Sequence, residues 1–373
     1  MPDQSSSPVS ARVAFGEGFL RDCWWFAALS SDLKPGALQR YVILGEPVLL
    51  GRDLDGRVYG LRDICPHRAA PLSAGEMLRT KNADGTEACV VQCCYHGWTF
   101  SVSGDTAGAC TDVPSLTQDQ TVDVARFRVR SYAVREQQGI VWIYITDDVR
   151  RPADPDHEPP ILPGVVGGKP VIVETMDFDS HIDHAVVGLM DPAHGPYVHQ
   201  QWWWRSAKKQ LEKTKKFEPR DMGFAMVRHA PSSNSRAYRI LGGAPATEIV
   251  FRLPGLRYEH ILIGDRQVLS LTCLTPVNDK KTRITQIFWS DHGLFRLIAP
   301  IFRQGARAFL KQDGDMVNLQ NEGLKYDPSL LWIDDADTQA KWYQQLKKEW
   351  LSARAEKRPF VNPVKPATLK WRS

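Results

Sequence analysis

Two short stretches of this chain decide how it folds. Residues 65–75 read CPHRAAPLSAG, and residues 93–100 read CCYHGWTF. Each stretch begins with a cysteine that a histidine follows closely, in the patterns C-x-H and C-x2-H. Two thiolates and two imidazoles in paired loops are the ligand set of an asymmetric [2Fe–2S] cluster, with two thiolates on one iron and two imidazoles on the other. The residues that we predict as cluster ligands are Cys65, His67, Cys93 and His96.

A zinc site is the alternative, because zinc binds the same ligand types in a tetrahedral arrangement. The flanking residues favour the cluster, since Pro71-Leu72 and Gly97-Trp98 surround the ligands with turn-forming and apolar side chains. The C-x2-H spacing selects Cys93 over Cys94 as the ligand. We expect the remaining cysteines to be buried small hydrophobic residues; they are Cys23, Cys89, Cys94, Cys110 and Cys273.

Composition is that of a globular protein. The chain has 373 residues, of which 43% are hydrophobic and 24% charged, and 12 are tryptophan. A net charge of +4, with no basic stripe, gives no indication of nucleic-acid binding. No stretch is apolar enough to span a membrane, and the polar start lacks the features of a signal peptide. We therefore expect a cytoplasmic protein, in which seven cysteines indicate metal ligation rather than disulfides.

The predicted fold class is α+β, with two domains joined by a Pro-rich linker. We expect an N-terminal arm at 1–20, an all-β cluster domain at 21–150, the linker at 151–170, a second metal domain at 171–350 and a C-terminal arm at 351–373. Short apolar runs broken by turn signals predict the first domain's strands. The predicted strands are 41–44, 48–51, 58–61, 88–92, 127–134 and 139–145, with an inserted hairpin around Lys81–Glu87.

An antiparallel sheet and a long helix are predicted for the second domain. The predicted strands are 171–178, 247–253, 258–263, 267–274 and 282–289, and a short helix is predicted at 182–189. After Pro300, which we place in a first helical turn, apolar residues recur at helical intervals. One long helix should therefore pack on this sheet.

A second metal site is indicated by Asp191, His194 and His199, which are spaced as D-x2-H-x4-H. Positions five apart diverge by about 140° on a helix of 3.6 residues per turn. Pro196 disfavours helical geometry at Gly195, and the resulting break would bring His199 round to the same ion. Two histidines and one carboxylate on one face of Fe(II) leave positions open for O2 and substrate.

The carboxylate must come from elsewhere in the chain, and Asp313 is our choice. With Ala306, Leu310 and Val317 it forms a stripe on the last helix with spacings of 4, 3 and 4. A lone aspartate among core residues is costly unless it is paired or bound to metal. Asp315 is the competitor, but it points away from that stripe.

Together the motifs resemble those of the Rieske-type ring-hydroxylating non-haem iron oxygenases, over roughly residues 20–320. This resemblance implies a Rieske domain followed by a helix-grip catalytic domain. It implies His194, His199 and Asp313 as ligands of a mononuclear Fe(II). It also implies that Asp191 bridges this iron and a neighbouring subunit's cluster, within a homotrimer.

The resemblance further implies an activity. Such a terminal oxygenase uses O2, and electrons from a separate ferredoxin or NAD(P)H-dependent reductase, to hydroxylate or oxidatively demethylate an aromatic or alicyclic small molecule. Two other interpretations remain open from the residues. One is a Rieske electron carrier without oxygenase activity, and the other is a zinc-stabilised ligand-binding protein.

For several residues, two interpretations remain open. Where the family has an Asn or a Glu–Asn pair, this chain has acidic and histidine residues that either support the site or serve structure: Asp177, Asp179, His181, Asp183 and His184. Trp202-Trp203-Trp204 either lines a pocket or packs in the core. A lysine cluster is expected to be a solvated face, with docking of an acidic ferredoxin as the alternative: Lys208, Lys209, Lys213, Lys215 and Lys216.

Overall fold

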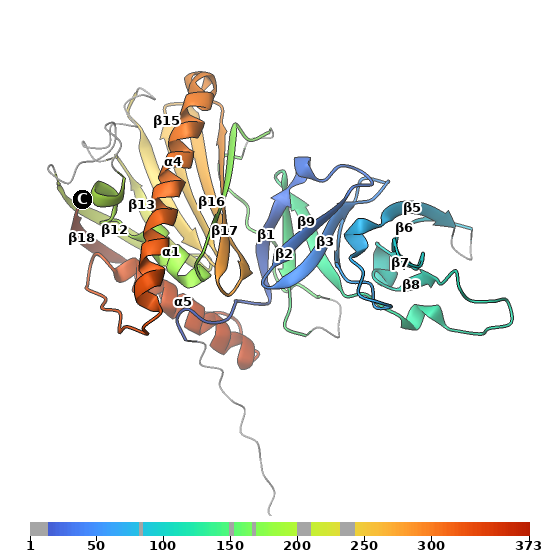
Figure 1. Cartoon of the computed structure of the whole chain (residues 1–373). Helices are drawn as coiled ribbons and strands as arrows, with labels where there is room; N and C mark the ends of the chain where they lie inside the picture. Colours follow the sequence, from blue (N-terminus) through green and yellow to red (C-terminus); the bar gives the residue numbers. More distant parts are fainter. Residues whose placement is uncertain (1–13, 82–84, 149–152, 166–168, 200–209, 232–242) are drawn as a thin grey trace, which may run out of the picture.

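The computed structural model describes residues 14–81, 85–148, 153–165, 169–199, 210–231 and 243–373. Trp202-Trp203-Trp204, Lys208 and Lys209 lie outside the described residues. Within the described part of the chain, the strands form three antiparallel sheets (Figure 1). The observed fold class is therefore the predicted α+β class.

The first 150 residues form two of these sheets. A six-stranded sheet has the order β1-β10-β9-β4-β3-β2, and a four-stranded sheet has the order β5-β6-β7-β8. The strands are β1 (Cys23–Leu29), β2 (Leu38–Ile43), β3 (Glu46–Arg52), β4 (Val58–Arg62), β5 (Glu76–Lys81), β6 (Glu87–Gln92), β7 (Thr99–Ser101), β8 (Cys110–Asp112), β9 (Ser131–Gln137) and β10 (Ile140–Ile145). Short 3-10 helices lie between them at η1 (Ser30–Asp32), η2 (Leu72–Ala74), η3 (Gly104–Thr106) and η4 (Val124–Arg126). The expected hairpin is β5–β6, in which Lys81 pairs with Glu87.

The third sheet has eight strands in the order β11-β17-β16-β15-β14-β13-β12-β18. Its strands are β11 (Ile172–Phe178), β12 (Glu212–Arg220), β13 (Gly223–His229), β14 (Ala246–Arg252), β15 (Leu256–Ile263), β16 (Arg266–Asn278), β17 (Lys281–Ser290) and β18 (Ala367–Arg372). The helices are α1 (Ile182–Met190), α2 (Gly195–Val198), α4 (Gly293–Leu324) and α5 (Thr338–Ala355). Figure 1 shows α4 running across this sheet, with α5 below it.

The C-terminal residues are not the surface arm that the sequence suggested. β18 pairs with β12 along the edge of the large sheet, and Leu369 and Trp371 are buried. Lys213 is also buried, and its ammonium group donates to the Ser373 hydroxyl at 2.7 Å. Lys213 therefore does not belong to a solvated lysine face. Hydrophobic residues spaced two apart near the C-terminus form this strand because an open sheet edge is available to them.

Helix α4 begins earlier than expected. It starts at Gly293, and the His292 side chain caps it by accepting from the Phe295 N–H, so Pro300 lies inside the helix rather than in its first turn. The predicted inward residues Ala306, Leu310 and Val317 are buried. Gly314 permits the close approach to the sheet, since a Cβ there would lie 3.1 Å from the Phe178 ring.

A buried carboxylate fixes α1. Asp183, which is fully buried, accepts hydrogen bonds from the Tyr343 hydroxyl at 2.6 Å, the Lys347 ammonium at 2.6 Å and the Gly16 N–H at 2.7 Å. The partners come from α5 and from the segment before β1. One residue in the first turn of α1 therefore ties three parts of the chain together.

The two halves of the molecule share one core. The backbone N–H groups of Leu44 and Gly45 donate to the carbonyls of Pro276 and Val277, which joins the β2–β3 turn to β16. A single hydrophobic cluster includes Val48 and Leu50 from one half and Ile182 and Leu346 from the other. The relative placement of the two halves is thus fixed by side-chain packing as well as by the covalent connection between them.

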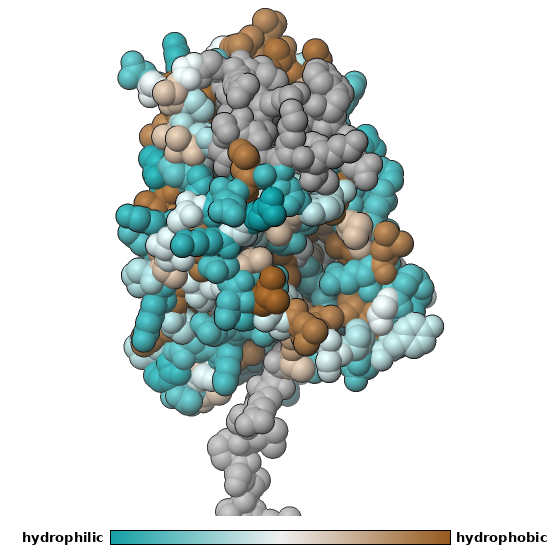
Figure 2. Space-filling model, turned by 90° about the vertical axis from the view of Figure 1, so that its left-hand side faces the viewer, coloured by the Kyte–Doolittle hydropathy of each residue, from teal (hydrophilic) through white to brown (hydrophobic). Residues whose placement is uncertain are grey.

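Hydrophilic side chains cover most of the face shown in Figure 2, and hydrophobic ones gather at its upper edge. None of the described helices combines the length and the hydrophobicity that crossing a bilayer requires.

The Asp183 network predicts a large stability effect for one lysine of α5. Lys347→Met leaves a fully buried carboxylate without its cation, and we expect the free energy of unfolding to fall by about 3–5 kcal/mol. Chemical denaturation followed by circular dichroism measures this change.

Lys341 on the same helix is the matched control. Its ammonium group contacts the exposed Asp334 carboxylate at 2.7 Å, so Lys341→Met should cost less than about 1 kcal/mol. Equal losses for the two variants would show that Asp183 does not anchor α1.

Candidate metal centres

The two cluster loops share one backbone hydrogen-bond pattern. The Cys65 N–H donates to the Ala70 carbonyl and the Cys93 N–H to the Trp98 carbonyl, both at 2.8 Å. The residues four positions after each cysteine return the bond to the cysteine carbonyl, at 2.9 Å in the first loop and 3.1 Å in the second. These residues are Ala69 and Gly97, and both have positive φ angles. The chain thus builds the same turn twice and presents one cysteine and one histidine from each.

Thiols point inward and imidazoles outward at this site. Cys65 and Cys93 are buried, whereas His67 and His96 are exposed with ring centroids 4.4 Å apart. Burial raises the pKa of the Cys65 thiol to about 11, and the neighbouring Cys93 thiol acts in the same direction. Two adjacent buried sulfurs are stable as thiolates only where a cation compensates them. The donor set therefore fits two iron ions, one bound by the two thiolates and the other by the two imidazoles.

The other cysteines follow the prediction with one exception. Cys94 is exposed, because the turn that directs Cys93 inward directs its neighbour outward. The remaining four are buried. Cys89 also lies near Asp53 and Asp55. Those two carboxylates form ion pairs with Arg57 and Arg79, which accounts for the cluster without a metal.

His194 and His199 flank a single helical turn. α1 ends at Met190, and α2 covers only Gly195–Val198, with His194 as its N-cap and His199 as its C-cap. The break comes at Asp191, the residue before Pro192, rather than at Gly195 as expected. A residue before proline avoids helical geometry, whereas Pro196 is accommodated in the first turn of α2.

Asp313, which lies on α4, is close to the two histidines. One of its oxygens lies 3.6 Å from His194 Nε2 and 3.4 Å from His199 Nε2, and the two Nε2 atoms are 3.1 Å apart. Burial raises the pKa of the Asp313 carboxyl to about 7, and the Arg257 guanidinium acts in the opposite direction. Asp315 is exposed and forms an ion pair with Lys311. The donor set of two imidazoles and one carboxylate on one side fits Fe(II).

Hydrogen bonds orient both imidazoles. His194 Nδ1 lies 2.8 Å from the Asp191 carbonyl oxygen, and His199 Nδ1 lies 3.2 Å from Gln312 Oε1. An Nδ1–H that donates to oxygen leaves the Nε2 lone pair free to bind a metal. The Phe309 ring also stacks on His199, with centroids 3.9 Å apart. Sequence reasoning missed Gln312, although its position next to Asp313 was the available signal.

Asp191 caps the end of α1 beside this site. Its carboxylate accepts from the Ala193 N–H at 2.7 Å and lies 3.7 Å from His194 Nδ1. Burial raises the pKa of this carboxyl. Asp191 thus contacts His194 with both its backbone and its side chain.

The five polar residues upstream of Asp191 have structural contacts. Asp177 forms an ion pair with Arg283, and Asp179 accepts from Asn321 through its backbone. Besides Asp183, the N-terminal segment is held by two histidines of this group. His181 contacts the Gly18 carbonyl at 2.9 Å, and His184 packs on the Phe15 ring. We find none of these five among the residues that line the cavity.

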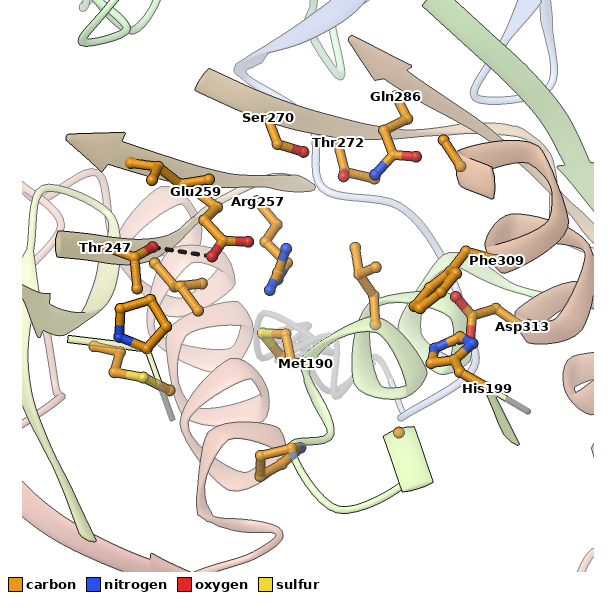
Figure 3. Close-up of a pocket in the computed structure, with 18 of the residues that line it drawn as sticks. Met190, His199, Thr247, Arg257, Glu259, Ser270, Thr272, Gln286, Phe309 and Asp313 are labelled. Carbon is orange, nitrogen blue, oxygen red and sulfur yellow. Dashed lines mark hydrogen bonds and ion pairs between the residues drawn. The ribbon is translucent and has the colours of Figure 1, made fainter. Parts of the chain in front are cut away.

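A cavity of about 330 Å³ opens beside His194, His199 and Asp313. It lies between α4 and the large sheet, and its polar residues come mostly from neighbouring strands (Figure 3). Its apolar wall includes Met190, Ile249, Ile261, Phe288, Phe302 and Leu310. This volume is within the range of small-molecule sites.

A comparison with protein families matches residues 23–133 to the Rieske [2Fe–2S] domain. The chain carries a Rieske domain. Both loops, with their predicted ligand pairs, fall within the matched residues. The resemblance predicted from the two cluster motifs is confirmed.

Sequence identity with curated relatives supports the same resemblance. The chain is 32% identical over 191 residues to the iron–sulfur subunit of a toluene-4-sulfonate monooxygenase system from Comamonas testosteroni, covering 48% of this chain and 47% of the relative. It is 34% identical over 187 residues to the oxygenase component of dicamba O-demethylase from Stenotrophomonas maltophilia, covering 49% and 48%. The matched part of the chain thus spans about half the length of these relatives.

Solved structures extend the likeness to the whole fold. The crystal structure of dicamba monooxygenase bound to dicamba superposes with a TM-score of 0.70 at 23% identity, covering 91% of this chain and 99% of that one. A second structure of that protein, with non-heme iron and dicamba, gives 0.68 at 21% identity. The Rieske domain is thus followed by a domain of the dicamba monooxygenase fold.

Gln312 gives a test of how the mononuclear site is oriented. Gln312→Leu removes the acceptor for His199 Nδ1, and we expect Fe(II) affinity to fall about 10- to 100-fold. Competition with a chromophoric chelator measures this affinity. Gln320→Leu, an exposed change on the same helix, should leave it unaltered. Unchanged affinity in Gln312→Leu would contradict the orienting role.

Proposed function

We propose that this chain is the terminal oxygenase of a Rieske-type system. It takes electrons from a separate ferredoxin or NAD(P)H-dependent reductase. With O2, it hydroxylates or oxidatively demethylates an aromatic or alicyclic small molecule. Cys65, His67, Cys93 and His96 hold the [2Fe–2S] cluster, and His194, His199 and Asp313 hold Fe(II).

One observation carries this proposal. The ligand atoms of His194, His199 and Asp313 all lie within 4.8 Å of one another and open into an apolar cavity, in a chain that also carries a Rieske domain. A pure electron carrier needs neither the triad nor the cavity. A zinc-stabilised binding protein would not account for the match of residues 23–133 to the Rieske [2Fe–2S] domain.

The residues of the site have separable tasks. When bound, Fe(II) supplies O2 activation, with coordination positions left open by three protein ligands. Asp313 contributes the negative charge, and the two histidines contribute neutral nitrogen donors that Gln312 and the Asp191 carbonyl keep in the correct tautomer. The apolar wall excludes water and holds the substrate's carbon skeleton next to the triad.

Asp191 is proposed as the bridge to a neighbouring subunit's cluster. It contacts His194 directly. In Figure 1 the cluster loops, near β5 and β7, lie at the far end of the molecule from α4 and the large sheet. This separation supports delivery of electrons between chains, and hence a head-to-tail homotrimer.

The names of the relatives support the reaction class. They include a toluene-4-sulfonate monooxygenase system and a dicamba O-demethylase, which are a monooxygenation and a demethylation. A carbazole 1,9a-dioxygenase from Metapseudomonas resinovorans is also a relative, at 29% identity. We propose monooxygenation or demethylation for this chain because the two relatives named above are more similar to it, at 32% and 34% identity.

Asp313→Ala tests the mononuclear iron. The variant should lose the catalytic iron and substrate-dependent oxygen uptake at least about 100-fold, because one of three ligands is missing. Acid-labile sulfide and the electron paramagnetic resonance signal of the reduced cluster should remain as in the wild type.

Asp315→Ala is the matched control, because Asp315 lies on the solvent side of the same helix turn. It should retain iron and oxygen uptake. Full oxygen uptake in Asp313→Ala would contradict the assignment, and absence of acid-labile sulfide in the wild type would favour zinc.

Mixed subunits test electron delivery between chains. His96→Ala should lack a competent cluster and Asp313→Ala the catalytic iron, so each alone is inactive. Co-expressed at equal amounts and assembled at random, they should recover about a quarter of wild-type oxygen uptake, because about one interface in four over all trimers then joins an intact cluster to an intact iron site. No recovery in a verified mixed trimer would contradict the inter-subunit route.

A further inference from the structure

Arg257 lines the cavity and forms no ion pair with any described residue. It lies on β15, where Arg257, Glu259 and Ile261 alternate onto the cavity face. Figure 3 shows its side chain directed into the space between Glu259 and Met190. Among the described residues, no carboxylate lies within ion-pair distance of its guanidinium group. A half-buried cation that forms no ion pair at contact distance is costly to the fold, so its presence points to a ligand.

Thr272 and Gln286 form a second polar point. They are direct cross-strand partners on β16 and β17, and both line the cavity. Thr272 is 1% exposed, and its hydroxyl oxygen lacks a hydrogen-bond partner, as does the Gln286 Oε1 atom. Figure 3 shows the two side chains next to each other on the sheet. Buried polar atoms are almost always satisfied, so a bound molecule is the expected partner.

The glutamate and the two lysines of the sheet wall are already engaged. Glu259 accepts a hydrogen bond from the Thr247 hydroxyl at 2.9 Å, which holds it at the edge of the cavity. Lys213 donates to Ser373, and Lys215 to the Ala230 carbonyl. Arg257 is therefore the cation that a ligand in this cavity would meet.

We propose that the cavity selects a ring-bearing small molecule with an oxyanion, a carboxylate or a sulfonate, bound by Arg257. A neutral hydroxyl group of the same molecule binds at this second point, where it donates to Gln286 Oε1 and accepts from the Thr272 hydroxyl, and the carbon skeleton packs on the apolar wall. This inference rests on the proposed function only in taking the cavity as the substrate site. The planar guanidinium fits two oxygens of one anion at once, which a lysine does not.

Binding measurements test the anion without requiring turnover. Isothermal titration calorimetry is performed on anaerobic, fully metallated protein with 4-hydroxybenzoate and 4-hydroxybenzamide, which differ in charge but hardly in shape. The wild type should bind the benzoate about tenfold tighter or more. Arg257→Met should remove this preference by weakening the benzoate alone, and Arg257→Lys should retain part of it.

Arg307→Met is the matched control, since Arg307 is exposed on α4 outside the cavity, and it should keep the preference. Circular dichroism and cluster absorbance verify the folding of every variant. A parallel titration with 4-hydroxybenzenesulfonate distinguishes carboxylate from sulfonate as the favoured oxyanion.

Thr272→Val, which preserves side-chain shape, tests the second contact. It should remove the preference for 4-hydroxybenzoate over 4-methylbenzoate and leave 4-methylbenzoate affinity unchanged. Equal binding of charged and neutral probes by the wild type, or no binding of any anion, would overturn the inference. An enzyme that consumes oxygen with neutral substrates while ignoring anions would do so too, yet would leave the proposed function intact.

Discussion

The buried carboxylate of Asp183 is the constraint on which the arrangement of this molecule depends. Fully buried, it accepts hydrogen bonds from the Lys347 ammonium, the Tyr343 hydroxyl and the Gly16 N–H together. One turn further along α5, the Trp350 indole donates to the Arg21 carbonyl just before β1. The start of α1 is thereby fixed to α5 and to the entry of the Rieske domain. Because α1 is short, fixing its start also fixes its end, where Asp191 and His194 lie.

The two candidate metal centres reach their geometry by different routes. In the cluster loops a local turn is built twice, and the same hydrogen bonds place each cysteine inward and each histidine outward. The mononuclear site instead joins residues more than a hundred positions apart. It depends on the short α2 turn between the histidines and on the close approach of α4, which Gly314 allows against Phe178. A helix one methyl group farther from the sheet would carry Asp313 away from both imidazoles.

This difference explains what the sequence could predict. Spacing alone predicted the candidate cluster ligands and the two histidines, because each motif is local, and helical periodicity separated Asp313 from Asp315. The break between the histidines was placed at Pro196 rather than Pro192, since either proline accounts for it and only packing decides. β12, β13, β18 and α5 were missed because their patterns are weak without the neighbours that bury them. Arg257 and Thr272 could not be assigned, because alternation in a strand predicts two faces but not which one borders a cavity.

The charged residues that line the cavity balance one another, although the proposed ligand is an anion. Three carboxylates border it, on Asp191, Glu259 and Asp313, and three cations, on Lys213, Lys215 and Arg257. The protein alone is therefore balanced there, which by itself favours a neutral ligand. The proposed ligand triad, however, would hold a divalent cation. Because the three carboxylates and the three cations cancel, the two charges of a bound metal ion would give the cavity an excess of positive charge next to an apolar wall, where electrostatic interactions are strong. An anionic substrate reduces this excess, so occupancy of the metal site and selection of an anion reinforce each other.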